Sequence, residues 1–184
     1  MVEEALIVGS FALAALATVL LVRILRRNRR RRGAPTGRLN DRLAETHTVE
    51  RTHLERPPRV SELATVGRTD DGAPVVVPIV EVELGSTEPP SEELAFEFVA
   101  SVLRAIHPEL SERSVRHYDV RFRFGPSGLL VSRNCMRIAV TPALAERLVA
   151  EDDYRPRDLR RAVRRADDGD EAEAPVLWGE CRSY

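Results

Sequence analysis

An uncharged apolar run near the start of the chain, followed at once by a cluster of arginines, restricts the architecture more than any other feature. Residues 5–22 carry no charge, and ten of these eighteen residues are Leu, Ile, Val or Phe. As an α-helix the run would be about 27 Å long, close to the ~30 Å hydrocarbon thickness of a bilayer. Its acidic leader, with Glu3 and Glu4, argues against a cleaved signal peptide, which begins with basic residues. We therefore predict a retained transmembrane helix over residues 5–25.

The arginines that follow this run predict how the helix is oriented. Seven arginines fall within ten positions: Arg23, Arg26, Arg27, Arg29, Arg30, Arg31 and Arg32. Because basic flanks stay on the cytoplasmic side, we expect residues 1–4 outside the cell membrane and the rest of the chain in the cytoplasm. The same arginines are expected to contact the anionic lipid headgroups of the bilayer.

The charges of the whole chain are balanced, with 28 basic residues, all of them arginines, and 29 acidic residues. Since the cluster beside the apolar run is strongly basic, the remainder is acidic on balance. This distribution argues against nucleic acid as the main partner, although a membrane tether for nucleic acid stays open as an alternative.

The cysteine and histidine content predicts neither a metal site nor a cofactor. Cys135 and Cys181 are the two cysteines, and no CxxC motif or histidine cluster accompanies them. In a domain expected in the cytoplasm, the two residues are predicted to be free thiols.

The chain divides after the membrane segment into a tether and a folded domain. Residues 26–72 combine dense charge with repeated Gly and Pro, which is typical of a basic juxtamembrane segment followed by a flexible tether. Residues 73–184 are long enough for one small hydrophobic core. We predict that they form a cytoplasmic α+β domain.

Strand and helix patterns alternate along this domain. The periodicities and capping residues predict, in order, strand 75–84, helix 91–107, strand 117–124, strand 129–140, a helix from Thr141-Pro142, a basic helix 156–166 and strand 176–181. Apart from the basic helix, the order is βαββαβ, the ferredoxin-like pattern. In that fold the first strand lies beside the third in an antiparallel sheet, and the helices cover one face.

The alternation along the strands predicts which side chains lie on the uncovered face of the sheet. Tyr118, Val120 and Phe122 share one parity, which we assign to the core. A three-residue loop after Gly125 would set Arg121 opposite Arg133. The same register would set Asp119 opposite Cys135.

Six charged residues on this uncovered face are the candidate binding site: Glu81, Glu83, Arg121, Arg123, Arg133 and Arg137. One interpretation is a solvated face with cross-strand ion pairs. The other starts from Arg121 facing Arg133, because two like charges in that position would bind a carboxylate or phosphate of a partner.

The sequence predicts a non-enzymatic function, since it contains no recognisable catalytic motif. We expect a single-pass membrane protein whose domain is an adapter or regulatory module. Its partner would be another protein or a second copy of the chain. The basic helix 156–166 could contact anionic lipid or an acidic partner, or could be solvated. The alternative is a small-ligand sensor or enzyme that uses the open face of the sheet.

Overall fold

The computed structural model describes residues 36–46, 54–126, 133–167, 179–181 and 184. They all belong to one compact α+β unit, which extends from Thr36 to Tyr184. The predicted transmembrane helix 5–25 and the arginine cluster after it lie outside the described residues. Among the helices that are described, none is long and apolar enough to cross a membrane.

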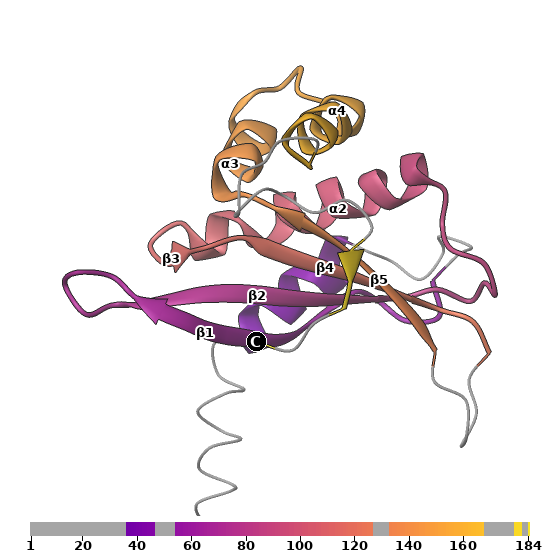
Figure 1. Ribbon diagram of the computed structural model, residues 1–184, viewed down its shortest axis with the longest axis horizontal. Helices are drawn as coiled ribbons and strands as arrows, with labels where there is room; N and C mark the ends of the chain where they lie inside the picture. Colours follow the sequence, from indigo (N-terminus) through magenta and orange to yellow (C-terminus); the bar gives the residue numbers. More distant parts are fainter. Residues whose placement is uncertain (1–35, 47–53, 127–132, 168–178, 182–183) are drawn as a thin grey trace, which may run out of the picture. The chain divides into compact units, whose positions relative to one another are not determined.

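A single mixed sheet forms the centre of this unit (Figure 1). Its strands are β1 (Arg59–Arg68), β2 (Pro74–Glu83), β3 (Ser114–Val115), β4 (Tyr118–Phe124), β5 (Asn134–Val140) and β6 (Gly179–Glu180). The order across the sheet is β1-β2-β4-β5-β6, and the short β3 pairs with β2 just before β4 begins. β2 and β4 are parallel, whereas the other neighbours along this order are antiparallel.

This topology corrects the predicted ferredoxin-like arrangement. The strand predicted at 75–84, now β2, lies beside β4 and not beside β5. The physical reason is the extra strand β1, which forms a hairpin with β2 and occupies its other edge. Gly72, with φ of 84°, provides the left-handed residue that this hairpin turn needs. The helix α2 (Glu92–Ile106) then returns the chain to the free edge of β2, so that β2, α2 and β4 form a parallel βαβ unit.

Three helices lie on one side of the sheet: α2 (Glu92–Ile106), α3 (Pro142–Ala150) and α4 (Pro156–Asp167). Both predicted N-caps are confirmed, since the backbone N–H of Leu94 donates to Ser91 Oγ and that of Leu144 to Thr141 Oγ1. The basic helix predicted at 156–166 is also confirmed, as α4. A short 3₁₀ helix, Pro108–Leu110, follows α2.

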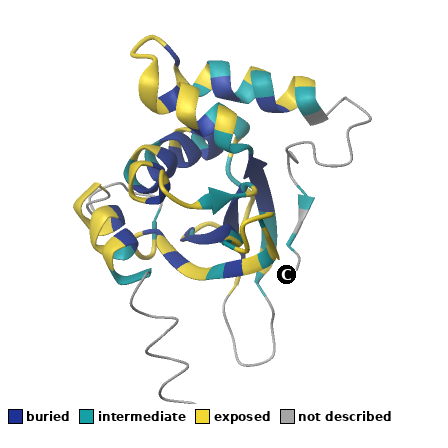
Figure 2. Cartoon of the chain, turned by 90° about the vertical axis from the view of Figure 1, so that its left-hand side faces the viewer, coloured by how far each residue is buried: buried dark blue, intermediate teal, exposed yellow. Residues whose placement is uncertain are grey.

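The core lies between the sheet and these helices, and its residues are dark blue in Figure 2. The strands contribute the parity that the sequence assigned to the core, including Tyr118, Val120 and Phe122. Leu159 and Val163 of α4 are fully buried in the same core. The apolar side of the basic helix is therefore occupied within the domain, and its arginines face outward.

The folded unit begins well before residue 73, the predicted end of the tether. Residues 36–46 are helical and bury Leu39 and Leu43 in the core. The Asn40 side chain fixes this helix to β1, because Oδ1 accepts from the Val60 N–H at 2.6 Å and Nδ2 donates to the Val60 carbonyl at 3.4 Å. The segment expected to be a flexible tether thus supplies a helix and a strand to the domain.

The register between β4 and β5 differs by four residues from the predicted one. Arg121 lies opposite Arg137, and Arg123 lies opposite Cys135. The cause is the connection, which runs from Gly125 to Arg133 and is longer than the three-residue loop expected. Because four is an even number, every side chain stays on its predicted face of the sheet.

Candidate functional site

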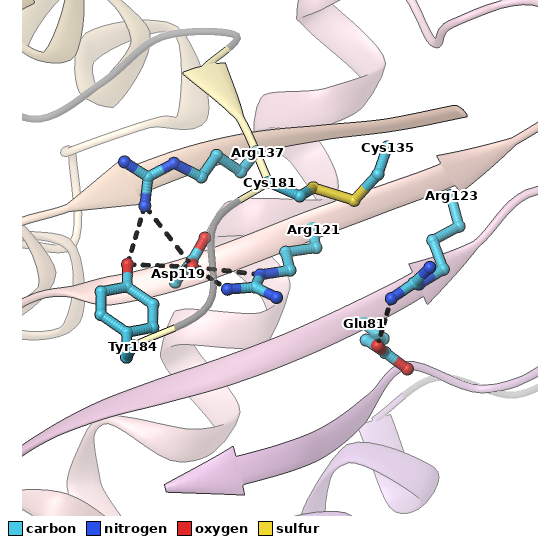
Figure 3. The surroundings of a disulfide bond; sticks show 8 residues. All are labelled: Glu81, Asp119, Arg121, Arg123, Cys135, Arg137, Cys181 and Tyr184. Carbon is cyan, nitrogen blue, oxygen red and sulfur yellow. Dashed lines mark hydrogen bonds and ion pairs between the residues drawn. A yellow bond between two sulfur atoms is a disulfide. The ribbon is translucent and has the colours of Figure 1, made fainter. Parts of the chain in front are cut away.

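All six predicted site residues lie on the sheet face that points away from α2, and they form two groups of ion pairs. The first group is built around Glu81 and Glu83 of β2, and the second around Asp119 of β4. Figure 3 shows Glu81 with Arg123 and Asp119 with Arg121 and Arg137. The parallel pairing brings Glu81 beside Arg121 and Glu83 beside Arg123. The predicted sheet order placed strand 129–140, which carries Arg133 and Arg137, beside the glutamates. The structure corrects this order, although Arg133 still contacts Glu83.

Glu81 bridges two arginines on the strands that flank it. Its Oε2 accepts from Arg59 Nη2 at 2.8 Å, and its Oε1 accepts from Arg123 Nη2 at 2.9 Å. Burial raises the pKa of Glu81, but the hydrogen bonds and charges of the two guanidiniums outweigh this effect and lower it overall. Glu81 is therefore held as a carboxylate on a largely buried part of the sheet.

Glu83 connects this group to Arg133, the residue before β5. Arg133 Nη1 lies 3.5 Å from Glu83 Oε2, and Arg133 Nη2 donates to Glu55 Oε1 at 2.6 Å. The hydrogen bond to Glu55 raises the pKa of Arg133, so this guanidinium keeps its charge. Arg56 and Arg59 also lie within ion-pair distance of Glu83, at 3.6 and 3.9 Å.

The second group is buried, and its centre is a carboxylate with no exposure to solvent. Asp119 is 0% exposed, and its Oδ2 accepts from both Nε and Nη2 of Arg121, at 3.1 and 2.9 Å. Arg137 Nη1 lies 3.6 Å from the same oxygen. The arginine that faces Arg121 is therefore Arg137, and the two share a carboxylate that offsets their repulsion.

Tyr184 covers this second group with its hydroxyl. The hydroxyl donates to Asp119 Oδ2 at 3.0 Å and accepts from Arg137 Nη1 at 2.7 Å. It also lies 2.8 Å from His117 Nε2, and the guanidinium of Arg121 stands 5.9 Å from the centre of the ring. Burial and the charge of Asp119 raise the pKa of Tyr184, so the hydroxyl remains a hydrogen-bond donor.

A disulfide between Cys135 and Cys181 attaches this part of the chain to the sheet (Figure 3). The two Cα atoms are 5.9 Å apart, within the usual range for a disulfide. The prediction of free thiols is therefore wrong. The predicted register placed Cys135 opposite Asp119, but in the structure Cys135 lies opposite Arg123. We call this bond the tail disulfide.

Several buried polar atoms of this face have no hydrogen-bond partner in the described structure. They are Asp119 Oδ1, Arg133 Nε and Arg137 Nε. Such groups are costly to bury when they are unpaired. The charged face therefore retains capacity for further hydrogen bonds.

A buried histidine forms another polar cluster, which sequence reasoning did not identify. His107 Nδ1 lies 2.6 Å from the Tyr118 hydroxyl, and its Nε2 lies 2.7 Å from Glu146 Oε2. Local sequence patterns could not identify this cluster, because the contacts of His107 are with residues 11 and 39 positions away. Tyr118 is 1% exposed, and burial raises its pKa strongly. Its hydroxyl faces the core, where it joins β4 to α2 and α3.

The basic helix α4 borders a groove of about 430 Å³ against α2. Acidic, basic and apolar side chains line the groove: Glu93, Glu97, Arg104, Arg155, Arg157 and Arg160, together with Phe96 and Pro156. Other arginines of α4 have acidic partners, since Arg161 pairs with Asp158 at 2.6 Å and Arg164 with Glu92 at 2.5 Å. These pairs fit the interpretation of α4 as a solvated helix with its own counterions.

Within the described residues, no group of three or more His, Cys, Asp or Glu side chains is arranged to hold a metal ion. Comparisons with protein-family models, curated protein sequences and solved structures find no match to this chain.

Proposed function

We propose that the protein is a single-pass membrane-anchored binding module, with its folded domain in the cytoplasm and the charged sheet face as its partner-binding surface. The observation that carries this proposal is the fixed pattern of charges on that face. Guanidiniums and carboxylates are held there by ion pairs of 2.6–3.6 Å between segments far apart in the sequence. A surface with such ordered charges favours a partner of complementary pattern and suppresses others.

Part of this surface is accessible to a partner. The Arg59 and Arg123 side chains are 55% and 37% exposed, while the carboxylate of Glu81 that they share is nearly buried. A partner can therefore contact the outer donors of these guanidiniums while Glu81 keeps them in position. Because the anchor would confine both proteins to one membrane, modest contacts would suffice, with effective concentrations of about millimolar for short flexible linkers.

The enzymatic alternative has less support from the described residues. Cys135, which the predicted register placed on this face as a free thiol, is bonded to Cys181. The Glu146–His107–Tyr118 cluster ends in a hydroxyl that faces the core, where a substrate has no access. We therefore assign binding, not catalysis, to the charged face.

The experiment is partner capture from native membranes with the full-length protein as bait. One variant carries Arg59→Glu and Arg123→Glu, and the matched control carries Arg157→Glu and Arg161→Glu on the exposed side of α4. The proposal predicts that the same protein is captured by the wild type and the control but lost with the first variant.

Other results would exclude the proposal. If both double variants retain the partner, or only the α4 variant loses it, the charged face is not the binding surface. Material that disappears on nuclease treatment would instead support a tether for nucleic acid. Extraction of the protein by alkaline carbonate would refute the transmembrane anchor.

A further inference from the structure

The tail disulfide and Tyr184 lie beside the buried half of the charged face, which consists of Asp119, Arg121 and Arg137. We propose that Tyr184 covers a carboxylate-binding site on Arg137, and that reduction of the tail disulfide by a dithiol opens this site. The inference rests on the proposed function and deepens it, because it assigns a ligand chemistry and a control mechanism to the same surface.

Arg137 is the group that Tyr184 occupies. This arginine is 5% exposed, its Nη1 donates to the Tyr184 hydroxyl at 2.7 Å, and its Nε has no partner. Its remaining contact in the described structure is with Asp119, at 3.6 Å. The Asp119 oxygen concerned already accepts two hydrogen bonds from Arg121. If Tyr184 leaves, the counterion of Arg137 is Asp119, which lies 3.6 Å away and is shared with Arg121.

A carboxylate is the ligand that balances the charges of this site, because Arg121 and Arg137 carry two positive charges and Asp119 carries one negative charge. A guanidinium presents its donors in a planar fork that matches a carboxylate, and such charge-assisted hydrogen bonds are stronger than neutral ones. The hydroxyl of Tyr184 satisfies one donor of Arg137 but brings no negative charge. An acidic side chain of the partner protein would supply both the acceptors and the charge.

The tail disulfide adds to the hydrogen bonds of the Tyr184 hydroxyl in holding Tyr184 over this site. The described part of this segment pairs with β5 at only two positions, Met136 with Glu180 and Arg137 with Gly179. Two such pairs are a short ladder, and Tyr184 as a whole residue is close to half exposed. The covalent bond to Cys135 keeps the segment in place because it limits how far Cys181 can move from β5.

The reduction step is balanced as an ordinary thiol–disulfide exchange. A thiolate of the dithiol attacks one sulfur of the tail disulfide, the S–S bond breaks, and a mixed disulfide forms. The second thiol of the dithiol then displaces the protein sulfur, which takes up a proton. The dithiol is oxidised to a disulfide, and Cys135 and Cys181 are reduced by two electrons to thiols. Both cysteines are partly exposed, so a dithiol can reach the bond.

The location proposed for the domain makes a reversible bond the expected one. Stable disulfides are rare in the cytoplasm, and those that form there are usually transient or redox-sensing. A disulfide that fixes a short segment over a charged site matches this class.

The test measures binding of a fluorescent hexaglutamate peptide by the full-length protein in detergent, with a hexaglutamine peptide as the uncharged probe. We expect the hexaglutamate peptide to bind at least about tenfold more tightly after dithiothreitol treatment than to the oxidised protein. The variant with Cys135→Ser and Cys181→Ser should bind tightly with or without reductant. Equal affinity in the oxidised and reduced forms, or no binding by either, would overturn the proposal.

Two further variants separate the site from effects on folding. Tyr184→Ala should let the oxidised protein bind the peptide, since it removes the cover and leaves the disulfide intact. In the cysteine-free background, Arg137→Gln should abolish binding, whereas Arg157→Gln on α4 should not change it. If the oxidised Tyr184→Ala variant does not bind the peptide, Tyr184 does not cover the site, whatever the result for Arg137→Gln.

Trapping of thiols in intact cells tests the control mechanism. Alkylation before lysis should find a reduced fraction that changes when the cellular thiol pool is oxidised. A bond that is always complete in cells would overturn reduction as the opening step. Partner capture that persists while the peptide test fails would keep the binding module and discard the covered site. The converse result would keep the site and discard the module.

Discussion

Removal of the charge on Asp119 should destabilise the protein more than removal of other paired carboxylates. Asp119→Asn keeps the shape of the side chain but leaves Arg121 and Arg137 without the anion they share. Asp119 is 0% exposed and Arg137 only 5%, so water cannot replace the lost charge. Breaking a buried ion pair by removing one partner typically costs about 3–5 kcal/mol, because the other charge stays buried and uncompensated.

The structure offers a matched control for this substitution. Glu151 pairs with Arg147 at 3.1 Å, one helical turn away, and both side chains are about half exposed. Glu151→Gln therefore removes a pair of similar length whose partner can be solvated by water. Exposed pairs of this spacing contribute about 0.3–0.5 kcal/mol. The two substitutions should differ about tenfold in their effect on the free energy of unfolding.

The assay is urea unfolding of the oxidised full-length protein in mild detergent, followed by far-ultraviolet circular dichroism. The difference should appear as a lower urea midpoint for Asp119→Asn with an unchanged slope. A loss of less than about 1 kcal/mol for Asp119→Asn would contradict the reasoning, because the buried group would then behave like an exposed pair. A changed slope would show that the denatured or native state itself had become different.

Three further variants test other parts of the structure by the same urea assay. Replacing Cys135 and Cys181 by Ser should cost up to about 4 kcal/mol, the chain-entropy value for a 46-residue separation, and dithiothreitol should reproduce this loss in the wild type. Tyr118→Phe should cost about 1–3 kcal/mol, because a buried nitrogen of His107 loses its partner. The pKa of Glu81 is lowered in the folded protein, so its contribution is complete above the unfolded pKa of about 4.3 and is lost as the pH falls through the lower folded value. Glu81→Gln should therefore flatten the dependence of stability on pH in that acidic range.

Local signals in the sequence were sufficient for the helices and for the faces of the strands. Ser91 and Thr141 cap α2 and α3 as predicted, because a capping side chain acts on backbone groups within its own turn. The alternation along β4 identified Asp119 and Arg121 as residues of the polar face, since successive side chains of a strand point to opposite sides. These features depend on residues only a few positions apart.

Local sequence patterns could not predict the strand β1 or the order of the sheet, because both depend on pairing with distant segments of the chain. β1 contains two register irregularities, between Val60 and Glu62 and between Thr65 and Gly67, which break the alternation expected of a strand. Its charged residues and its glycine are typical of a linker, and it forms a strand because it pairs with β2. With β1 on one edge of β2 and β4 on the other, the order of the sheet changes, whereas the pairing of β4 with β5 stays as predicted. The order of the sheet was therefore wrong although most of its elements were right.

The two cysteines connect the predicted location of the domain with its chemistry. The arginines after residue 22 predict that the domain stays in the cytoplasm, a compartment that keeps most thiols reduced. The structure nevertheless joins Cys135 to Cys181, at a position that fixes Tyr184 over Arg137. These two features agree if the bond forms and breaks in the cell, because the disulfides that form among cytoplasmic thiols are usually transient or redox-sensing. The redox state of this cysteine pair would then decide whether the buried half of the charged face is closed or open to a partner.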